Sequence, residues 1–254
     1  MNVKKCTALT LLALAWQTLA WGQGGPPMLT DDPDTPGDGK WEINLAYVEV
    51  RVPGDRLRNV PRIDFNYGWG DRVQLKYETS WLFRTTDSTG TQSGIDNSLL
   101  GVKYRFLDEA DSGANVSVYP QLELANTRSS VARGIASHSP NLFIPFEFSR
   151  AFGRLHVVLE VGYERRHSDP GEWKFGALGA IEISQTMEVM GELRRAQEKF
   201  LGGGETIMNV GVKARLSENA KLLAALGKGL GRGADSPSLL IFLGLQLVFG
   251  QEHR

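Results

Sequence analysis

The sequence is poor in cysteine, in net charge and in long apolar runs. Cys6 is its one cysteine, so the chain forms no internal disulfide. Its 28 lysine and arginine residues nearly balance 29 aspartate and glutamate residues, which leaves no basic face for nucleic acid. After residue 22, no apolar run approaches the ~20 residues of a membrane-spanning helix. These deficits exclude a disulfide scaffold, a nucleic-acid-binding protein and a helical membrane protein.

The first 22 residues have the pattern of a secretory signal peptide. Lys4 and Lys5 form a positive n-region, Ala8–Trp16 is a short apolar h-region, and small residues follow at Ala20 and Gly22. We expect export and cleavage after one of these two small residues. The cysteine would leave with the signal peptide, so the mature chain would offer no thiolate to a metal. The mature length of about 230 residues suits one domain or one barrel.

From Trp41 to Phe249, apolar and polar residues alternate with a period of two, which predicts β-strands. About twelve runs have roughly the length that a tilted strand needs to cross a membrane. They lie at 41–47, 63–69, 73–81, 100–106, 116–124, 142–148, 155–163, 173–183, 187–193, 208–214, 220–226 and 238–249. This pattern favours an all-β fold, a transmembrane antiparallel up-and-down β-barrel.

The connections between these runs differ in length. Links at 68–71, 151–153, 184–185 and 217–219 are short, whereas polar links at 52–60, 85–93, 127–139, 166–171, 196–204 and 227–236 are longer. The link at 107–113 is the one expected short turn that is long. Outer-membrane barrels have short periplasmic turns and longer outer loops, and an even strand number puts both termini on the periplasmic side. Aromatic residues near both ends of the runs match two interfacial girdles.

Charged residues on one face of each strand predict the direction of the interior. In hydrocarbon, every backbone group must be paired, so the sheet must close. An ionised Arg or Lys facing lipid would cost roughly 2–4 kcal/mol near the midplane. We therefore expect the charged faces to line the lumen, with many opposite charges paired across strands. The residues expected there are Arg72, Lys76, Glu78, Lys103, Arg105, Glu123, Glu147, Glu160, Lys174, Glu182, Glu188, Glu192, Lys213 and Arg215.

Three stretches resemble a known family. They are TDDPDTPGDGKWEIN from Thr30, IDFNYGWGDRVQLKYETSW from Ile63 and SLLGVKYRFLDE from Ser98. They are similar to the "MetA-pathway of phenol degradation" family of outer-membrane barrel proteins, and the Asp-Asp-Pro-Asp-Thr-Pro opening is the most specific of them. The resemblance implies an outer-membrane barrel and a transport role for hydrophobic or aromatic compounds. It implies no catalytic residues. The chain departs from many barrels because Gly250–Arg254 follows its last aromatic residue.

The expected organisation is a signal peptide (1–22), a Pro/Asp-rich leader (23–40), a barrel (41–249) and a short C-terminal tail (250–254). Asp31, Asp32 and Asp34 lie in the stiff leader. Carboxylates can hold a hard cation, but no full ligand loop is visible, so we expect no bound metal. Our hypothesis is that the leader enters the periplasmic mouth as a plug and meets lumenal Arg or Lys.

Other motifs carry weaker signals. Glycines at 227, 229, 231 and 233 resemble a phosphate-binding run, but no helix pattern follows, so a flexible loop is expected. His138 adjoins Ser139 and His167 adjoins Ser168, but no spacing identifies the third group that orients a catalytic base. His156 is expected to point inward near Glu160 as a solvated or paired side chain. We predict no catalysis and no cofactor.

The function predicted from these features is an outer-membrane channel or transporter in a Gram-negative bacterium, for small hydrophobic or aromatic compounds. A barrel of about twelve strands is wider than one filled by side chains and narrower than a general porin. Two alternatives stay open. One is a lipid hydrolase that uses His138 or His156 as its base, and the other is a structural or adhesive barrel. Expected partners are outer-membrane lipid, a small-molecule solute and the barrel-assembly machinery, with no nucleic acid.

Overall fold

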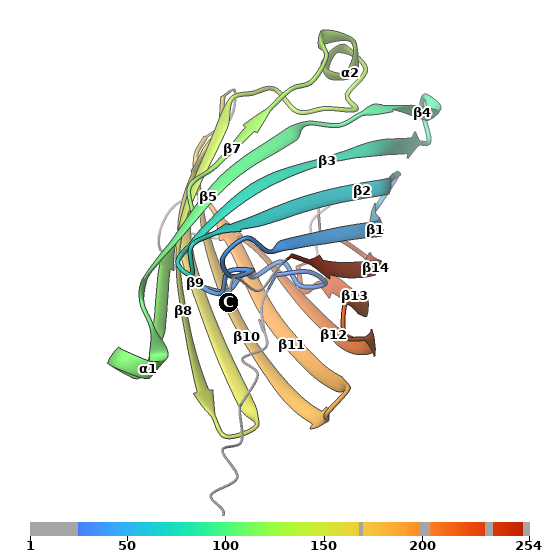
Figure 1. The fold of residues 1–254 in the computed structure, drawn as a ribbon. Coiled ribbons are helices and arrows are strands. Elements are labelled where there is room, and N and C mark those ends of the chain that lie inside the picture. Colours follow the sequence, from blue (N-terminus) through green and yellow to red (C-terminus); the bar gives the residue numbers. More distant parts are fainter. Residues whose placement is uncertain (1–24, 168–169, 199–203, 232–235, 251–254) are drawn as a thin grey trace, which may run out of the picture.

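The computed structural model describes residues 25–167, 170–198, 204–231 and 236–250. Their strands form one antiparallel sheet that closes on itself (Figure 1). The sheet closes where β1 (Trp41–Val52) pairs with β14 (Leu239–Phe249), in register from Trp41↔Phe249 to Arg51↔Leu239. The first and last strands therefore begin and end at the same rim. The predicted fold class, a closed antiparallel barrel of twelve strands, is confirmed.

Between β1 and β14, each strand pairs with its neighbours in the chain, as in an up-and-down barrel. The intervening strands are β2 (Asp55–Trp69), β3 (Val73–Thr86), β4 (Gly90–Ile95), β5 (Ser98–Leu107), β6 (Asn115–Val118), β7 (Gln121–Leu124), β8 (Asn141–Phe152), β9 (Leu155–Arg165), β10 (Glu172–Ser184), β11 (Met187–Gln197), β12 (Glu205–Ser217) and β13 (Ala220–Gly229).

Two of the twelve barrel strands are interrupted. β4 and β5 both pair with β3, on either side of a break at Asp96–Asn97. β6 and β7 both pair with β5 and β8, on either side of a break at Tyr119–Pro120. Proline has no N–H to donate to a ladder, which accounts for the second break. The fully buried side chain of Tyr119 lies inside the barrel at this break.

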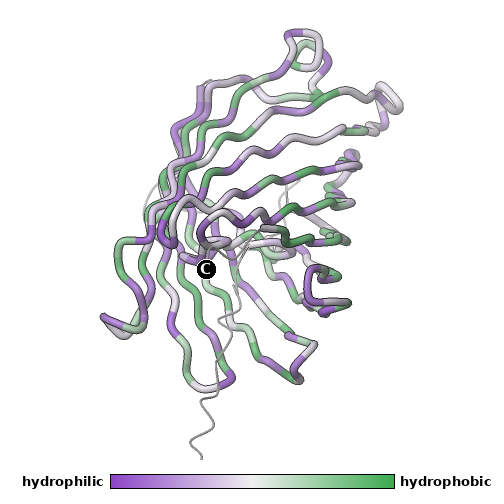
Figure 2. The backbone as a smooth tube through the Cα atoms, in the orientation of Figure 1, coloured by the Kyte–Doolittle hydropathy of each residue, from purple (hydrophilic) through white to green (hydrophobic). Residues whose placement is uncertain are grey.

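The barrel is apolar outside and polar inside. Large apolar side chains such as Leu100, Val102 and Val210 are exposed on its outer surface, at 45–57% of their area. Polar side chains are buried at the alternating positions. Hydrophilic and hydrophobic residues alternate along most strands (Figure 2). Buried polar side chains on the strands include Asn44, Asp64, Asn66, Gln74, Lys103, Glu147, Glu160, Glu188, Glu192, Asn209, Lys213 and Gln246. A water-soluble barrel has the opposite distribution, because its core excludes polar groups.

The connections form two different rims. The terminal rim, beside the first residue of β1, carries the turns 70–72, 108–114, 153–154, 185–186 and 218–219. The loop rim, opposite, carries the connections 53–54, 87–89, 125–140, 166–171, 198–204 and 230–238. The longest connection of each rim contains one short helix. This is α1 (Glu109–Ser112) at the terminal rim and α2 (Arg128–Ala132) at the loop rim. No helix among the described residues is long and apolar enough to cross a bilayer.

The prediction of long loops at 52–60 and 85–93 is wrong. β1 and β2 are joined by Pro53 and Gly54 alone, and β3 and β4 by residues 87–89. Gly54 has φ +77°, which suits the second central position of a tight turn after proline. The polar residues that were predicted to be loop belong to strands at the loop rim. Both faces of these strands are polar there, so the alternation with a period of two is lost.

Candidate functional site

The leader leaves the terminal rim and enters the barrel (Figure 1). Its last residues dock on the end of β2, where Gly39 N donates to Gly68 O at 3.0 Å and Gly68 N donates to Lys40 O at 2.9 Å. A Cβ on Gly68 would lie 1.9 Å from the carbonyl oxygen of Gly37, so a larger residue cannot stand there without moving the leader. Thr35 Oγ1 also donates to the carbonyl of Asp71 at 2.8 Å. These contacts fix the direction in which the leader enters.

The three predicted leader carboxylates lie along the route into the barrel. Asp32 is buried and Asp31 and Asp34 are half-buried. Lys103 of β5, with 1% of its side chain exposed, places Nζ 3.1 Å from Asp31 Oδ1 and also donates to the carbonyl of Asp32. Arg105, on the same strand, lies 3.5 Å from Asp34 Oδ1. The leader thus meets Lys103 and Arg105 of β5. Both residues are among those predicted to line the lumen.

We call the group around Lys103 the Lys103 cluster: Lys103, Asp31, Glu147 and Tyr119. Glu147 Oε2 of β8 lies 3.4 Å from Lys103 Nζ, and its side chain is fully buried. The ammonium lies 4.6 Å from the centre of the Tyr119 ring, within cation–π range. A buried ammonium is tolerated when it is paired and hydrogen-bonded. The cluster therefore depends on one acid from the leader and one from the barrel.

The ionisation of two leader carboxyls is shifted in opposite directions. Burial works against the charge of Asp31, but the positive charges of Lys103 and Lys76 outweigh it and lower the pKa of this carboxyl. Burial, assisted by the negative charge of Asp32, raises the pKa of Asp34 to about 7. Asp31 is thus held as a carboxylate, whereas Asp34 titrates near neutral pH.

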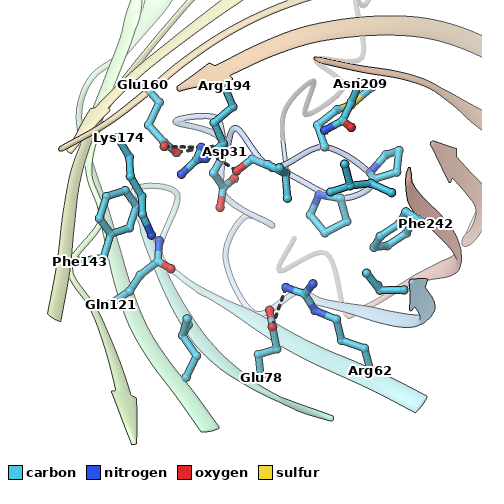
Figure 3. Close-up of a pocket in the computed structure, with 18 of the residues that line it drawn as sticks. Asp31, Arg62, Glu78, Gln121, Phe143, Glu160, Lys174, Arg194, Asn209 and Phe242 are labelled. Carbon is cyan, nitrogen blue, oxygen red and sulfur yellow. Dashed lines mark hydrogen bonds and ion pairs between the residues drawn. The ribbon is translucent and has the colours of Figure 1, made fainter. Parts of the chain in front are cut away.

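A second set of contacts holds the leader backbone. Glu192 of β11 accepts hydrogen bonds from the N–H groups of Leu29 and Thr30, each at 2.8 Å. Arg194 Nη1 donates to the carbonyl of Leu29 at 2.9 Å and lies 2.6 Å from Glu160 Oε1. Figure 3 shows Glu160, Arg194 and Asp31 together on one side of the cavity. Sequence reasoning placed Glu160 and Glu192 in the lumen but did not identify the backbone as their partner.

The leader also makes an apolar contact that sequence reasoning missed. Met28, 5% exposed, packs against five buried apolar side chains, which we call the Met28 socket: Val158, Leu178, Ala180, Met190 and Ala225. These residues come from the inner faces of β9, β10, β11 and β13. The signal was present, because residues 157–159 and 177–181 are apolar or glycine on both faces of their strands.

The leader separates two cavities. The loop-side cavity, about 290 Å³, is lined by Pro27, Met28 and Phe242 and by the ion pairs Arg62–Glu78, Lys174–Glu164 and Arg194–Glu160. Figure 3 shows Phe242 and the pairs Arg62–Glu78 and Arg194–Glu160. The terminal-side cavity, about 630 Å³, is lined by leader carboxylates and by Lys103, Lys213, Arg215 and Lys221. Gly25, Pro26 and Asp31 of the leader line both. The two cavities and the leader between them follow one route through the barrel.

Of the 14 predicted lumenal residues, 13 lie on barrel strands. Six are buried: Lys103, Glu147, Glu160, Glu188, Glu192 and Lys213. Seven are half-buried: Lys76, Glu78, Arg105, Glu123, Lys174, Glu182 and Arg215. Arg72 differs, because it lies in the turn before β3 at the terminal rim, with 48% of its side chain exposed and an ion pair to Asp108. Sequence reasoning missed several cross-strand partners, among them Asp64, which lies 3.0 Å from Lys76.

The other motifs are placed as follows. Within the described ranges, no group of three or more His, Cys, Asp and Glu side chains is arranged to hold a metal ion. His156 lies on β9 beside Ala151 and Ala180 of the neighbouring strands, and His138 lies in the connection that follows α2. Ser168, the predicted signal peptide (1–22), residues 232–235, which include Gly233, and residues 251–254 lie outside the described residues.

Known outer-membrane barrels share this fold. An outer membrane channel from Pseudomonas putida F1 superposes with a TM-score of 0.69 at 14% identity, covering 86% of this chain and 98% of its own. The KdgM porin gives 0.59 at 12% identity, covering 81% of this chain and 99% of its own. The NanC porin gives 0.54 at 12% identity, with 82% and 98% covered. The fold is therefore that of outer-membrane channels and porins.

None of the protein-family models and none of the curated proteins matches the chain. The resemblance to the phenol-degradation family therefore stays a prediction from the three sequence stretches.

Proposed function

We propose that the chain is an outer-membrane channel for small solutes, with small hydrophobic or aromatic compounds as its cargo, and that the leader closes it in this structure. The observation that carries the proposal is the pair of cavities, of about 290 and 630 Å³, with Gly25, Pro26 and Asp31 between them. A purely structural barrel does not need two cavities along its interior with the leader between them. The cargo class rests on the family resemblance.

The distribution of side chains supports a membrane location. The outer surface exposes rows of apolar side chains, and the polar groups and ion pairs are buried inside. An open sheet edge in hydrocarbon would leave backbone groups unpaired, and the β1–β14 seam closes that edge. In outer-membrane barrels the short turns face the periplasm. The terminal rim is then periplasmic, and the leader enters from that side.

The mixture of charges in the lumen supports a selective route rather than a wide pore. Ion pairs such as Arg62–Glu78 and Lys76–Asp64, at 2.7 and 3.0 Å, cross-link neighbouring strands and narrow the interior. Paired charges leave little net potential, so the lumen would not strongly favour one sign of ion. Passage is then controlled by whether the leader stays seated.

Planar-bilayer recordings test the plug. Deletion of residues 25–36, which leaves the docking segment at 37–40 in place, is expected to raise single-channel conductance several-fold, because the two cavities become continuous. The matched control, Asp38→Asn, changes one exposed leader residue that accepts a hydrogen bond from the N–H of Gly70. The amide oxygen of asparagine can accept the same bond, so conductance should be unchanged. Unchanged conductance in the deletion variant would contradict the plug.

Liposome swelling tests the channel itself. Solute-selective swelling with the deletion variant supports transport. If no solute passes and the purified protein instead releases fatty acid from lipid, the hydrolase alternative replaces the channel.

A further inference from the structure

The Met28 socket is a buried apolar site in a lumen whose strands also carry many charged and amide groups. Val158 and Ala180 are fully buried, and Leu178 and Met190 are 2% exposed. Charged side chains lie on the same inner faces, two residues from the socket in the cases of Glu160 and Glu192. A polar lumen does not require such a patch for barrel closure. Met28 of the leader packs into it, and Phe242 of β14 packs against the same cluster.

The leader backbone is held so that Met28 points into the socket. Glu192 binds the next two N–H groups, those of Leu29 and Thr30, and Arg194 binds the carbonyl of Leu29. These bonds fix the chain direction immediately after Met28. The socket and its polar border together form a site that accepts an apolar chain followed by hydrogen-bonding groups.

The shape of the socket suits an unbranched chain. Two of its five residues are alanine, and Gly211 of β12 forms part of its edge: a Cβ there would lie 2.6 Å from Met28 Cε. The present occupant is a linear thioether. A branched or bulky group of the same mass would have to displace strand residues rather than fill the same space.

The site adjoins the route a solute would take. Met28, Ala225 and Phe242 all line the loop-side cavity, so the socket opens onto that cavity once Met28 leaves it. A solute that enters from the loop rim reaches the socket before it reaches Asp32 and Asp34, which line the terminal-side cavity.

We propose that the Met28 socket is a binding site for the unbranched apolar end of a solute, which displaces Met28 and thereby unseats the leader. This inference rests on the proposed channel function and adds to it the means of opening. Met28 competes with the solute for the socket. Burial of a methionine side chain corresponds to roughly a ten- to hundredfold change in an equilibrium constant. The solute must bind strongly enough to overcome this contribution of Met28.

Methionine methyl NMR tests the site. The described chain has four methionines: Met28 and Met190 lie in the socket, while Met187 and Met208 are 39% and 40% exposed on the outer face. The full chain, labelled at the methionine methyl carbons and placed in lipid nanodiscs, is titrated with n-butyl methyl sulfide. We expect saturable shifts of Met28 and Met190 and unchanged signals from Met187 and Met208. Tert-butyl methyl sulfide, the branched isomer, should not produce the socket shifts.

Two variants sharpen the test. Met28→Ala removes the competitor and should tighten binding of the linear probe roughly ten- to hundredfold. Met28→Ala combined with Ala180→Met refills the socket from the barrel side and should abolish probe binding, while total side-chain volume is conserved. Folding of both variants is checked by the heat-dependent shift of barrel mobility on SDS gels. If both isomers shift all four methyl signals alike, the probe acts through the lipid and the site is overturned.

Conductance separates this inference from the proposed plug. In the complete chain the linear probe should raise conductance to that of the leader-deletion variant, and in that variant it should have no effect. Displacement of Met28 without a rise in conductance overturns the opening mechanism. If leader deletion itself leaves conductance unchanged, the plug fails, and the NMR titration still decides whether the socket binds the probe.

Discussion

The Lys103 cluster and the Met28 socket hold neighbouring parts of the leader by opposite means. In the cluster, the Lys103 ammonium is 1% exposed and depends on Asp31, Glu147 and the Asp32 carbonyl. In the socket, the thioether of Met28 packs with five buried apolar side chains. A buried charge pair contributes little net stability but is costly to break, whereas apolar burial contributes directly and tolerates exchange of the occupant. The cluster therefore fixes the position of the leader. The socket contributes binding free energy that another apolar group could supply in place of Met28.

The largest expected effect comes from breaking the cluster. Lys103→Ala leaves the buried Glu147 and the half-buried Asp31 without the ammonium that pairs with both, and we expect a loss of about 3–5 kcal/mol in the free energy of unfolding. Urea unfolding in detergent micelles measures it. Lys228→Ala makes the same charge change at an exposed position of β13, and should alter stability by less than about 0.5 kcal/mol. Equal losses in the two variants would show that the cluster is not a special site.

The next effect comes from emptying the socket. Met28→Ala should weaken leader seating by about 2 kcal/mol, because it removes a buried side chain and leaves a cavity that the barrel cannot close. Leader release is measured by the rate at which a maleimide labels a thiol introduced by Thr30→Cys, in a background with Cys6→Ser, since Thr30 is fully buried when the leader is seated. Met208→Ala, on the outer face, is the matched control and should leave the labelling rate at its original value.

A smaller effect is expected where the leader backbone is bound. Glu192→Gln removes the charge and replaces one of the two oxygens, which accept separately from the N–H groups of Leu29 and Thr30, by an amide nitrogen that cannot accept. One of the two bonds is therefore lost. Hydrogen bonds to charged groups contribute about 1.5–3 kcal/mol, so the loss should cost about 1.5 kcal/mol of seating. The same labelling assay should show a severalfold faster reaction. Glu182→Gln, on the neighbouring strand, controls for loss of a lumenal charge. An identical rate increase in that variant would show that Glu192 does not specifically hold the leader.

The smallest effect is that of pH. The pKa of Asp34 is about 7 in the seated leader and returns toward its ordinary value of 3.8 on release. The seated state thus binds a proton that the released state does not bind between about pH 4 and 7, so acidification from pH 8 to 6 should favour seating. Conductance should fall by a few-fold on acidification, an effect reduced by the partial exposure of Asp34. Asp34→Asn should remove this part of the pH dependence, and a profile unchanged by the substitution would exclude Asp34 as its source.

The sequence predicted the twelve strands and the inward direction of most charged residues because both follow from a period of two. Lys103, Glu147 and Glu192 are on the buried face that alternation assigned to them. The tight turn at Pro53–Gly54 was missed because strand residues beyond the bilayer are polar on both faces. The strand breaks at Asp96–Asn97 and Tyr119–Pro120 carry no periodic signal.

The candidate site was predicted in part. The acidic leader and the cations it meets are both charged, so their attraction is visible in composition. The Met28 socket is different, since Val158, Leu178 and Met190 look like ordinary strand residues until closure brings β9–β13 around the leader. Glu192 could be placed in the lumen by alternation, but a bond to a backbone N–H leaves no trace in the sequence.

The contact between Gly68 and the leader has a consequence for the order of assembly. Gly68 belongs to the first hairpin of the barrel, and it binds the residues immediately before β1, so this contact needs only the first third of the chain. The β1–β14 seam joins strands at opposite ends of the sequence, so we expect it to form after the first hairpin. We therefore expect the leader to be directed inward before the barrel wall is complete. The proposed plug would then be enclosed as the barrel forms and would not have to thread through a finished mouth.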